Sequence, residues 1–148
     1  MRFLVAIPVY NEERHLPGVL AAVRWYARDI LVIDDGSTDA TADLLRAERD
    51  VHRITHLENR GYGQSLIDAF AFADAHSYDW VITLDCDEQH EPACISQFVA
   101  AARRDDTDVI SGSRYLRPFP DDDDAPPDRR AINATITQYH PGTGNMNL

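Results

Sequence analysis

Residues 30–39 read ILVIDDGSTD, an apolar run that ends in a turn of acidic, glycine and hydroxyl residues. A continuous apolar run stopped by turn residues is typical of a strand that is buried on both faces. The turn also supplies an N-cap for a helix that the pattern predicts from about residue 40 to residue 48. A buried strand followed at once by a helix is the repeating unit of a parallel α/β sheet.

The same alternation continues on both sides of this stretch. Short apolar runs predict further strands over residues 3–7, 51–57 and 80–84, and a fifth strand centred on residues 109–110. Apolar spacing and turn residues predict helices over 12–27, after the glycine loop 59–63, and from Pro92 to about residue 103. The pattern therefore predicts an α/β fold of the Rossmann-like type, a mostly parallel sheet with helices on both faces.

The composition changes after residue 116. Residues 117–130 contain four prolines around the acidic run 121–124, which predicts a solvated loop. We therefore expect a core over 1–116 and an acidic, proline-rich loop with an incomplete further segment over 117–148.

The net charge of −11 argues against nucleic acid or an anionic membrane surface as the default partner. No apolar run approaches the ~18 residues of a membrane span, and Pro8 ends the first run too early for a signal peptide. Two cysteines are too few for a disulfide framework. We expect a cytoplasmic protein, in which any membrane contact is peripheral and at the inner face.

Polar clusters follow four of the expected strands, at residues 8–11, 34–35, 85–87 and 113–114. The carboxyl ends of parallel strands meet at one edge of a sheet, and ligands bind beyond that edge. The four clusters together predict a site there.

Asp85 and Asp87 stand one residue apart at a strand end. Two carboxylates this close are costly unless a cation compensates them, and their hard oxygens suit Mg²⁺ or Mn²⁺. Gln89 adds a neutral oxygen ligand. The alternative is a solvated acidic turn. Cys86 is expected to pack in the interior, because a soft thiolate suits neither ion.

Asp34 and Asp35 leave two interpretations open. One carboxylate caps the next helix, alone or with Ser37. The other accepts a hydrogen bond from a nucleobase ring N–H, which selects uracil or guanine. Gly36 lets the backbone turn tightly directly after them.

The loop 59–63 is either a plain helix start or a phosphate nest. Arg60 is placed to neutralise a diphosphate or to contact a base. Arg114 follows a strand end and provides the fork-shaped donor that an acidic protein needs for phosphate, with Arg129 and Arg130 as further candidates. The alternative for each arginine is a solvent-facing side chain.

Taken in order, these motifs resemble family 2 glycosyltransferases of the GT-A fold, particularly the branch of dolichyl- or polyprenyl-phosphate sugar synthases. The resemblance covers about residues 3–137, and the matching stretches are 7–13, 32–39, 59–63, 84–92 and 111–115.

The resemblance implies a role for each matching position. The expected nucleotide-sugar contacts are those of Pro8, Tyr10, Glu12, Asp35, Arg60 and Asp85. The implied metal ligands are Asp85, Asp87 and Gln89, the implied acceptor-phosphate ligands are Arg114 and Arg129, and the implied catalytic residues are Asp87 and Arg114.

The expected reaction moves a hexose, with inversion, from a UDP- or GDP-linked sugar to an acceptor, most simply a polyprenyl phosphate. Catalytic domains of the family continue past the matched region, so the resemblance implies a C-terminal truncation. The alternative is a remnant that binds nucleotide sugar without catalysis. A receiver-type phosphorylation module is disfavoured, because its acidic pair would follow the first strand, where residues 8–11 read PVYN.

Overall fold

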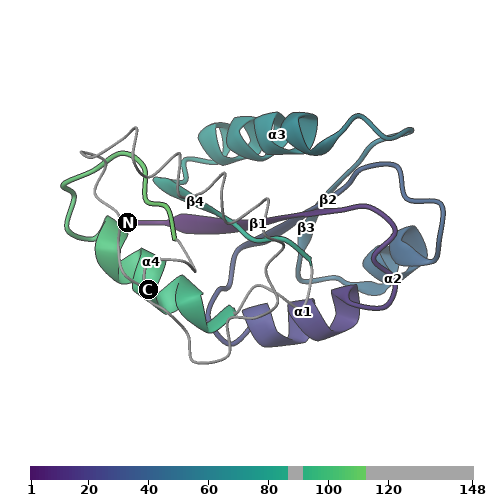
Figure 1. Cartoon of the computed structure of the whole chain (residues 1–148), viewed down its shortest axis with the longest axis horizontal. Coiled ribbons are helices and arrows are strands. Elements are labelled where there is room, and N and C mark those ends of the chain that lie inside the picture. Colours follow the sequence, from purple (N-terminus) through teal and green to yellow (C-terminus); the bar gives the residue numbers. More distant parts are fainter. Residues whose placement is uncertain (87–91, 113–148) are drawn as a thin grey trace, which may run out of the picture. The chain divides into compact units, whose positions relative to one another are not determined.

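The structure, a computed structural model, describes residues 1–86 and 92–112 (Figure 1). The chain divides into two compact units, residues 1–103 and 104–148. The first contains the sheet and its helices. The expected division between residues 116 and 117 stays a prediction.

The first unit is built on four parallel strands in the order β3-β2-β1-β4. The strands are β1 (Phe3–Val9), β2 (Ile30–Asp34), β3 (His52–Thr55) and β4 (Trp80–Thr83). In the centre of the sheet, Ile7 pairs with Val32. Because all four strands run the same way, their carboxyl ends lie along one edge.

Helices cover both faces of this sheet (Figure 1). They are α1 (Leu16–Val23), α2 (Thr41–Ala47), α3 (Tyr62–Ala75) and α4 (Ile95–Ala102), with the short 3₁₀ turn η1 (Pro92–Cys94) before α4. One face packs against α3, and the other packs against α1, α2 and α4. The predicted α/β fold, a parallel sheet between two layers of helices, is confirmed.

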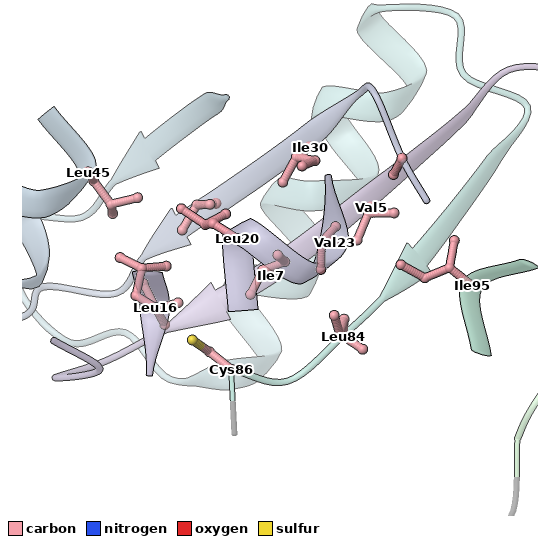
Figure 2. Close-up of a cluster of buried hydrophobic side chains, with 13 residues drawn as sticks. Val5, Ile7, Leu16, Leu20, Val23, Ile30, Leu45, Leu84, Cys86 and Ile95 are labelled. Atoms are coloured by element: carbon pink, nitrogen blue, oxygen red, sulfur yellow. The ribbon is translucent and has the colours of Figure 1, made fainter. Parts of the chain in front are cut away.

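The alternation of side chains along β1 and β2 builds the two cores. Val5, Ile7 and Val32 face α1, whose Leu16 and Leu20 complete that cluster (Figure 2). Leu4, Ala6, Leu31 and Ile33 face α3 on the opposite side, against its small residues Ala69 and Ala73. Since both faces of β2 are buried, its run is apolar throughout, as expected for a central parallel strand.

The expected strand at residues 109–110 is wrong. Within 104–112, the described part of the second unit, only Gly112 carries an isolated bridge, and the Val109 side chain is 80% exposed. Two apolar residues between Asp108 and Ser111 bury too little surface to hold a strand. Among the helices that the structure describes, none is long and apolar enough to cross a membrane.

Candidate functional site

The candidate site lies at the carboxyl edge of the sheet, where β1 contains Pro8. A proline lacks the N–H that a central strand normally donates. The carbonyl of Ala6 accepts from Leu84 on the β4 side, whereas the carbonyl of Val9 accepts from Asp35 on the β2 side. Because successive residues of a strand direct their backbone groups to opposite sides, the backbone nitrogen of Pro8 faces β4. The pairing of β1 with β4 ends at Ala6, before Pro8, so no hydrogen bond of the sheet is lost at the proline.

The loops after β1 and β2 are joined through Asn11, which has a positive φ of 57°. Its Oδ1 accepts from the amide of Thr38 at 2.7 Å, and its own amide donates to Oγ of Ser37 at 2.9 Å. Asparagine tolerates this backbone conformation better than most residues. The polar clusters of two strands therefore form one surface.

The start of α2 is capped from both loops. Asp39 accepts from the amide of Thr41 at 2.9 Å, and Glu13 accepts from the amide of Ala40 at 2.9 Å. The N-cap residue of α2, Ala40, has no side-chain cap hydrogen bond, so the expected capping by the carboxylate of Asp34 or Asp35 is wrong. Asp34 instead accepts from the amide of Ser37 at 3.0 Å and holds the turn itself.

Gly36 is required by both conformation and contact. Its φ is +75°, and a Cβ placed there would lie 2.4 Å from the backbone carbon of Glu58. The turn after β2 thus packs directly on the backbone of the loop after β3. The expected need for glycine at this turn is confirmed.

Asp35 organises the loop after β3. Its Oδ1 accepts from the amide of Arg60 at 2.9 Å and its Oδ2 accepts from the amide of Gly61 at 2.8 Å. Nδ1 of His56 lies 2.6 Å from Oδ1. Burial opposes the charge of Asp35, but His56 and the two amides outweigh it and lower the pKa of this carboxyl. The amides of Arg60 and Gly61 are engaged by Asp35, so this part of the loop does not offer them to a phosphate.

His56 extends this network into α3. Its Nε2 lies 2.7 Å from Oδ2 of Asp68, and Oδ1 of Asp68 accepts from Nε2 of Gln64 at 3.0 Å. Burial works against the imidazolium, but Asp35 and Asp68 together raise the pKa of His56. The result is a buried imidazole held between two carboxylates from different elements.

Tyr62, the first residue of α3, connects the loop to the end of β4. Its hydroxyl donates to the carboxylate of Asp85, and burial, followed by the charge and hydrogen bond of Asp85, raises the pKa of Tyr62. The ring is nevertheless half exposed. Through residues 60–62, the structure therefore links Asp35 after β2 with Asp85 after β4, across the end of β1.

A family described as "Glycosyl transferase family 2" matches residues 4–147. The chain belongs to glycosyl transferase family 2.

Relatives within family 2 include undecaprenyl-phosphate 4-deoxy-4-formamido-L-arabinose transferases of Salmonella. That of Salmonella paratyphi B is 41% identical, and those of Salmonella paratyphi A and Salmonella enteritidis are 42% identical. Each comparison covers 76% of this chain and 37% of the relative. The chain therefore spans well under half the length of these relatives.

The structure places some of the sequence-derived candidates of this family 2 chain at the edge. Tyr10 is 46% exposed there, Glu12 lies 2.7 Å from Nδ1 of His15, and the side chain of Arg60 is exposed. Cys86 packs with Leu16 and Leu84, as expected (Figure 2). The predictions for Asp87, Gln89, Arg114, Arg129 and Arg130 lie outside the described residues.

The implied metal ligands are described only at Asp85. Within residues 1–86 and 92–112, no group of three or more histidine, cysteine or acidic side chains is placed to hold a metal ion. The donor set implied by the sequence, two carboxylates and an amide oxygen, has the hard-oxygen character that suits Mg²⁺ or Mn²⁺. Asp85 stands at the correct edge to contribute.

The sequence patterns did not single out three residues of this network, His56, Tyr62 and Asp68. His56 directly follows the end of β3, the position where site residues gather in parallel sheets, and this signal was available. Asp68 lies inside a helix, where an acidic residue is ordinary. Only the packing of α3 brings Asp68 to His56.

Proposed function

We propose that this chain transfers a hexose from a UDP- or GDP-linked sugar to a polyprenyl phosphate, with inversion at the anomeric carbon and with Mg²⁺ or Mn²⁺ as cofactor. Membership of family 2 supports the reaction class, and the names of the relatives support the lipid phosphate acceptor. The observation that carries the proposal is the connection between two acidic residues at the carboxyl edge of the sheet. Asp35 and Asp85 are joined through residues 60–62 at the carboxyl ends of β2 and β4.

In this proposal the nucleoside binds over the ends of β1 and β2. Pro8, Tyr10 and Glu12 surround it, and the buried carboxylate of Asp35 accepts the ring N–H of uracil or guanine. The exposed side chain of Arg60 reaches the base or the diphosphate. Asp85 lies beside the ribose and diphosphate, where the half-exposed ring of Tyr62 borders it.

The transfer step needs little covalent participation by the protein. An oxygen of the acceptor phosphate attacks the anomeric carbon, and the bond to the donor diphosphate breaks with its electrons on the leaving oxygen. The acceptor is already anionic near neutral pH, so no base has to remove a proton. Arg114 and Arg129 hold the acceptor phosphate in line for attack.

Asp85, Asp87 and Gln89 would hold the Mg²⁺ or Mn²⁺ ion, which would supply electrostatic stabilisation of the leaving diphosphate. Preorganised stabilisation of this kind is a large contribution to catalysis.

A thermal-shift panel of UDP- and GDP-sugars, with and without Mn²⁺, tests donor binding, because a ligand that binds only the folded state raises the melting temperature. The same protein is then incubated with radiolabelled donor, short-chain polyprenyl phosphate and Mn²⁺. Formation of labelled lipid supports the proposal. Binding of the donor without any labelled lipid would instead support a non-catalytic nucleotide-sugar-binding protein, and no binding in the panel would refute both.

A further inference from the structure

The environment of His56 determines its protonation pattern. The residue is 7% exposed, and its two ring nitrogens face carboxylates at 2.6 Å and 2.7 Å, Asp35 from the end of β2 and Asp68 from α3. A neutral imidazole carries only one N–H and would present a lone pair to one of these carboxylates. The geometry therefore fits an imidazolium that donates to both.

Asp35 has little acceptor capacity left after these contacts. An ionised carboxylate offers about four lone-pair positions. His56 and the amide of Arg60 occupy two of them on Oδ1, and the amide of Gly61 occupies one on Oδ2. One position remains, on Oδ2, and its direction is set by the other three contacts.

We propose that His56 is a positioning residue for nucleobase recognition: it fixes the carboxylate of Asp35 so that the remaining lone pair of Oδ2 accepts the ring N–H of a uracil or guanine base. The inference rests on the proposed function, because it requires the base to bind at Asp35. It adds the residues that orient the acceptor, His56 directly and Asp68 through His56.

The groups around His56 explain why both of its ring nitrogens act as donors. Both facing carboxylates are charged, Gln64 donates to the second oxygen of Asp68, and Arg60 adds its positive charge near Asp68. Without the cation, the buried carboxylate of Asp35 and the part-buried carboxylate of Asp68 would have no positive charge between them, which is unfavourable. Without the donor at the position of Nδ1, the carboxylate of Asp35 would be free to rotate and change the direction of its open lone pair.

Two substitutions of His56 each keep one of its hydrogen bonds, to Asp35 or to Asp68, and remove the other. The amide of Asn reaches the position of Nδ1, so His56→Asn keeps a donor to Asp35 and loses the contact with Asp68. The longer Gln reaches the position of Nε2, so His56→Gln keeps a donor to Asp68 and loses the contact with Asp35. His76→Gln is the control, since His76 is exposed, lines the same hollow as His56 and Asp68, and contacts the carbonyl of Phe72.

Calorimetry with Mn²⁺ measures the affinity of each protein for UDP, GDP and their analogues methylated on the ring nitrogen, N3-methyl-UDP and N1-methyl-GDP. The methyl group removes the N–H that Asp35 would accept. We expect the wild type to prefer its unmodified nucleotide at least about tenfold, as a hydrogen bond to a charged group implies. This preference should persist in His56→Asn and His76→Gln. In His56→Gln the ratio of the affinities for the unmodified and the methylated nucleotide should fall towards one.

A second measurement needs no variant. In the wild type with ¹⁵N-labelled histidine, we expect NMR to show His56 protonated on both nitrogens and its Nδ1 proton shifting on addition of the preferred nucleotide but not of the methylated analogue. A His56 resonance that responds to both or to neither overturns the inference.

The outcomes distinguish this inference from the proposed function. If the wild type binds neither UDP nor GDP, the proposed function fails and the inference fails with it. If the wild type binds a nucleotide but shows no preference for the ring N–H, or if His56→Gln keeps that preference while folded, the inference is overturned and the proposed function stands.

Discussion

The amide of Gly61 donates to Oδ2 of Asp35 over 2.8 Å, and this bond ties the loop after β3 to the end of β2. Gly61 has a φ of +90° and stands directly before α3, so the bond also sets where that helix begins. The position of Tyr62, and with it the contact to Asp85, depends on this anchoring. One buried carboxylate thus controls the arrangement of a large part of the candidate site.

We expect Asp35→Asn to lower both stability and nucleotide affinity. An amide oxygen is a weaker acceptor for the amides of Arg60 and Gly61, and an amide N–H cannot accept from a base. The loss in each quantity should be about 1.5–3 kcal/mol, as for a hydrogen bond to a charged group. Urea denaturation and calorimetry measure the two effects, with the exposed Asp74→Asn as control. A drop in stability with unchanged affinity would limit Asp35 to a structural role.

Substitutions at three glycines separate the effect of a positive φ on stability from the effect of a close Cβ contact. Gly36 combines a positive φ with a Cβ contact of 2.4 Å, Gly61 has a positive φ and open space, and Gly63 has open space without a positive φ. Gly36→Ala should destabilise most, Gly61→Ala by about 1–2 kcal/mol, and Gly63→Ala should stabilise α3 by about 0.5–1 kcal/mol. Chemical denaturation of the three variants gives the order. Equal effects at Gly36 and Gly61 would show that the Glu58 contact relaxes without cost.

Nucleotide binding should depend on the metal. We expect EDTA and Asp87→Ala each to weaken UDP or GDP binding strongly, because the diphosphate then meets the acidic edge without a compensating cation. Calorimetry in Mn²⁺, in EDTA and with the control Asp74→Ala makes the comparison. The same affinity under all conditions would remove the metal from the proposal.

Arg114 should serve the acceptor and leave the donor unaffected. Arg114→Ala is expected to lower transfer to short-chain polyprenyl phosphate by at least about tenfold, the cost of one charge-assisted hydrogen bond, while donor affinity is unchanged. Initial rates against acceptor concentration and calorimetry with the donor test this. Arg46→Ala, on the exposed side of α2, is the control. If donor affinity falls by the same factor as transfer, Arg114 belongs to the donor site.

The stabilising effect of His56 should depend on pH. Its folded-state pKa is raised above the ordinary value of 6.5, so its contribution is fully present below about pH 6.5 and is lost as the pH rises through the folded value. We expect the difference in free energy of unfolding between the wild type and His56→Asn to decrease over that range. Urea denaturation from pH 5 to about pH 9 measures it. A constant difference would show that His56 does not change protonation on unfolding.

Local patterns along the sequence were sufficient for the elements of the sheet. The apolar runs at β1 and β2 and the glycine at 36 follow from burial and backbone conformation, which act over a few neighbouring residues. The rule that ligands bind at the carboxyl edge predicts Asp35 and Asp85 on the same side of the sheet, and the structure has them there. At residues 109–110 the same logic failed, because two apolar residues are too weak a signal.

What only the tertiary structure decided is how these side chains are connected. Asp35, His56 and Asp68 lie on a turn, a strand end and a helix, and nothing in their spacing shows that they contact one another. Their contacts arise because α3 packs small residues, Ala69 and Ala73, on the sheet and so brings Asp68 within 2.7 Å of His56. Hydrogen bonds act over about 3 Å, so they depend on this packing, which the sequence encodes only through the fold as a whole.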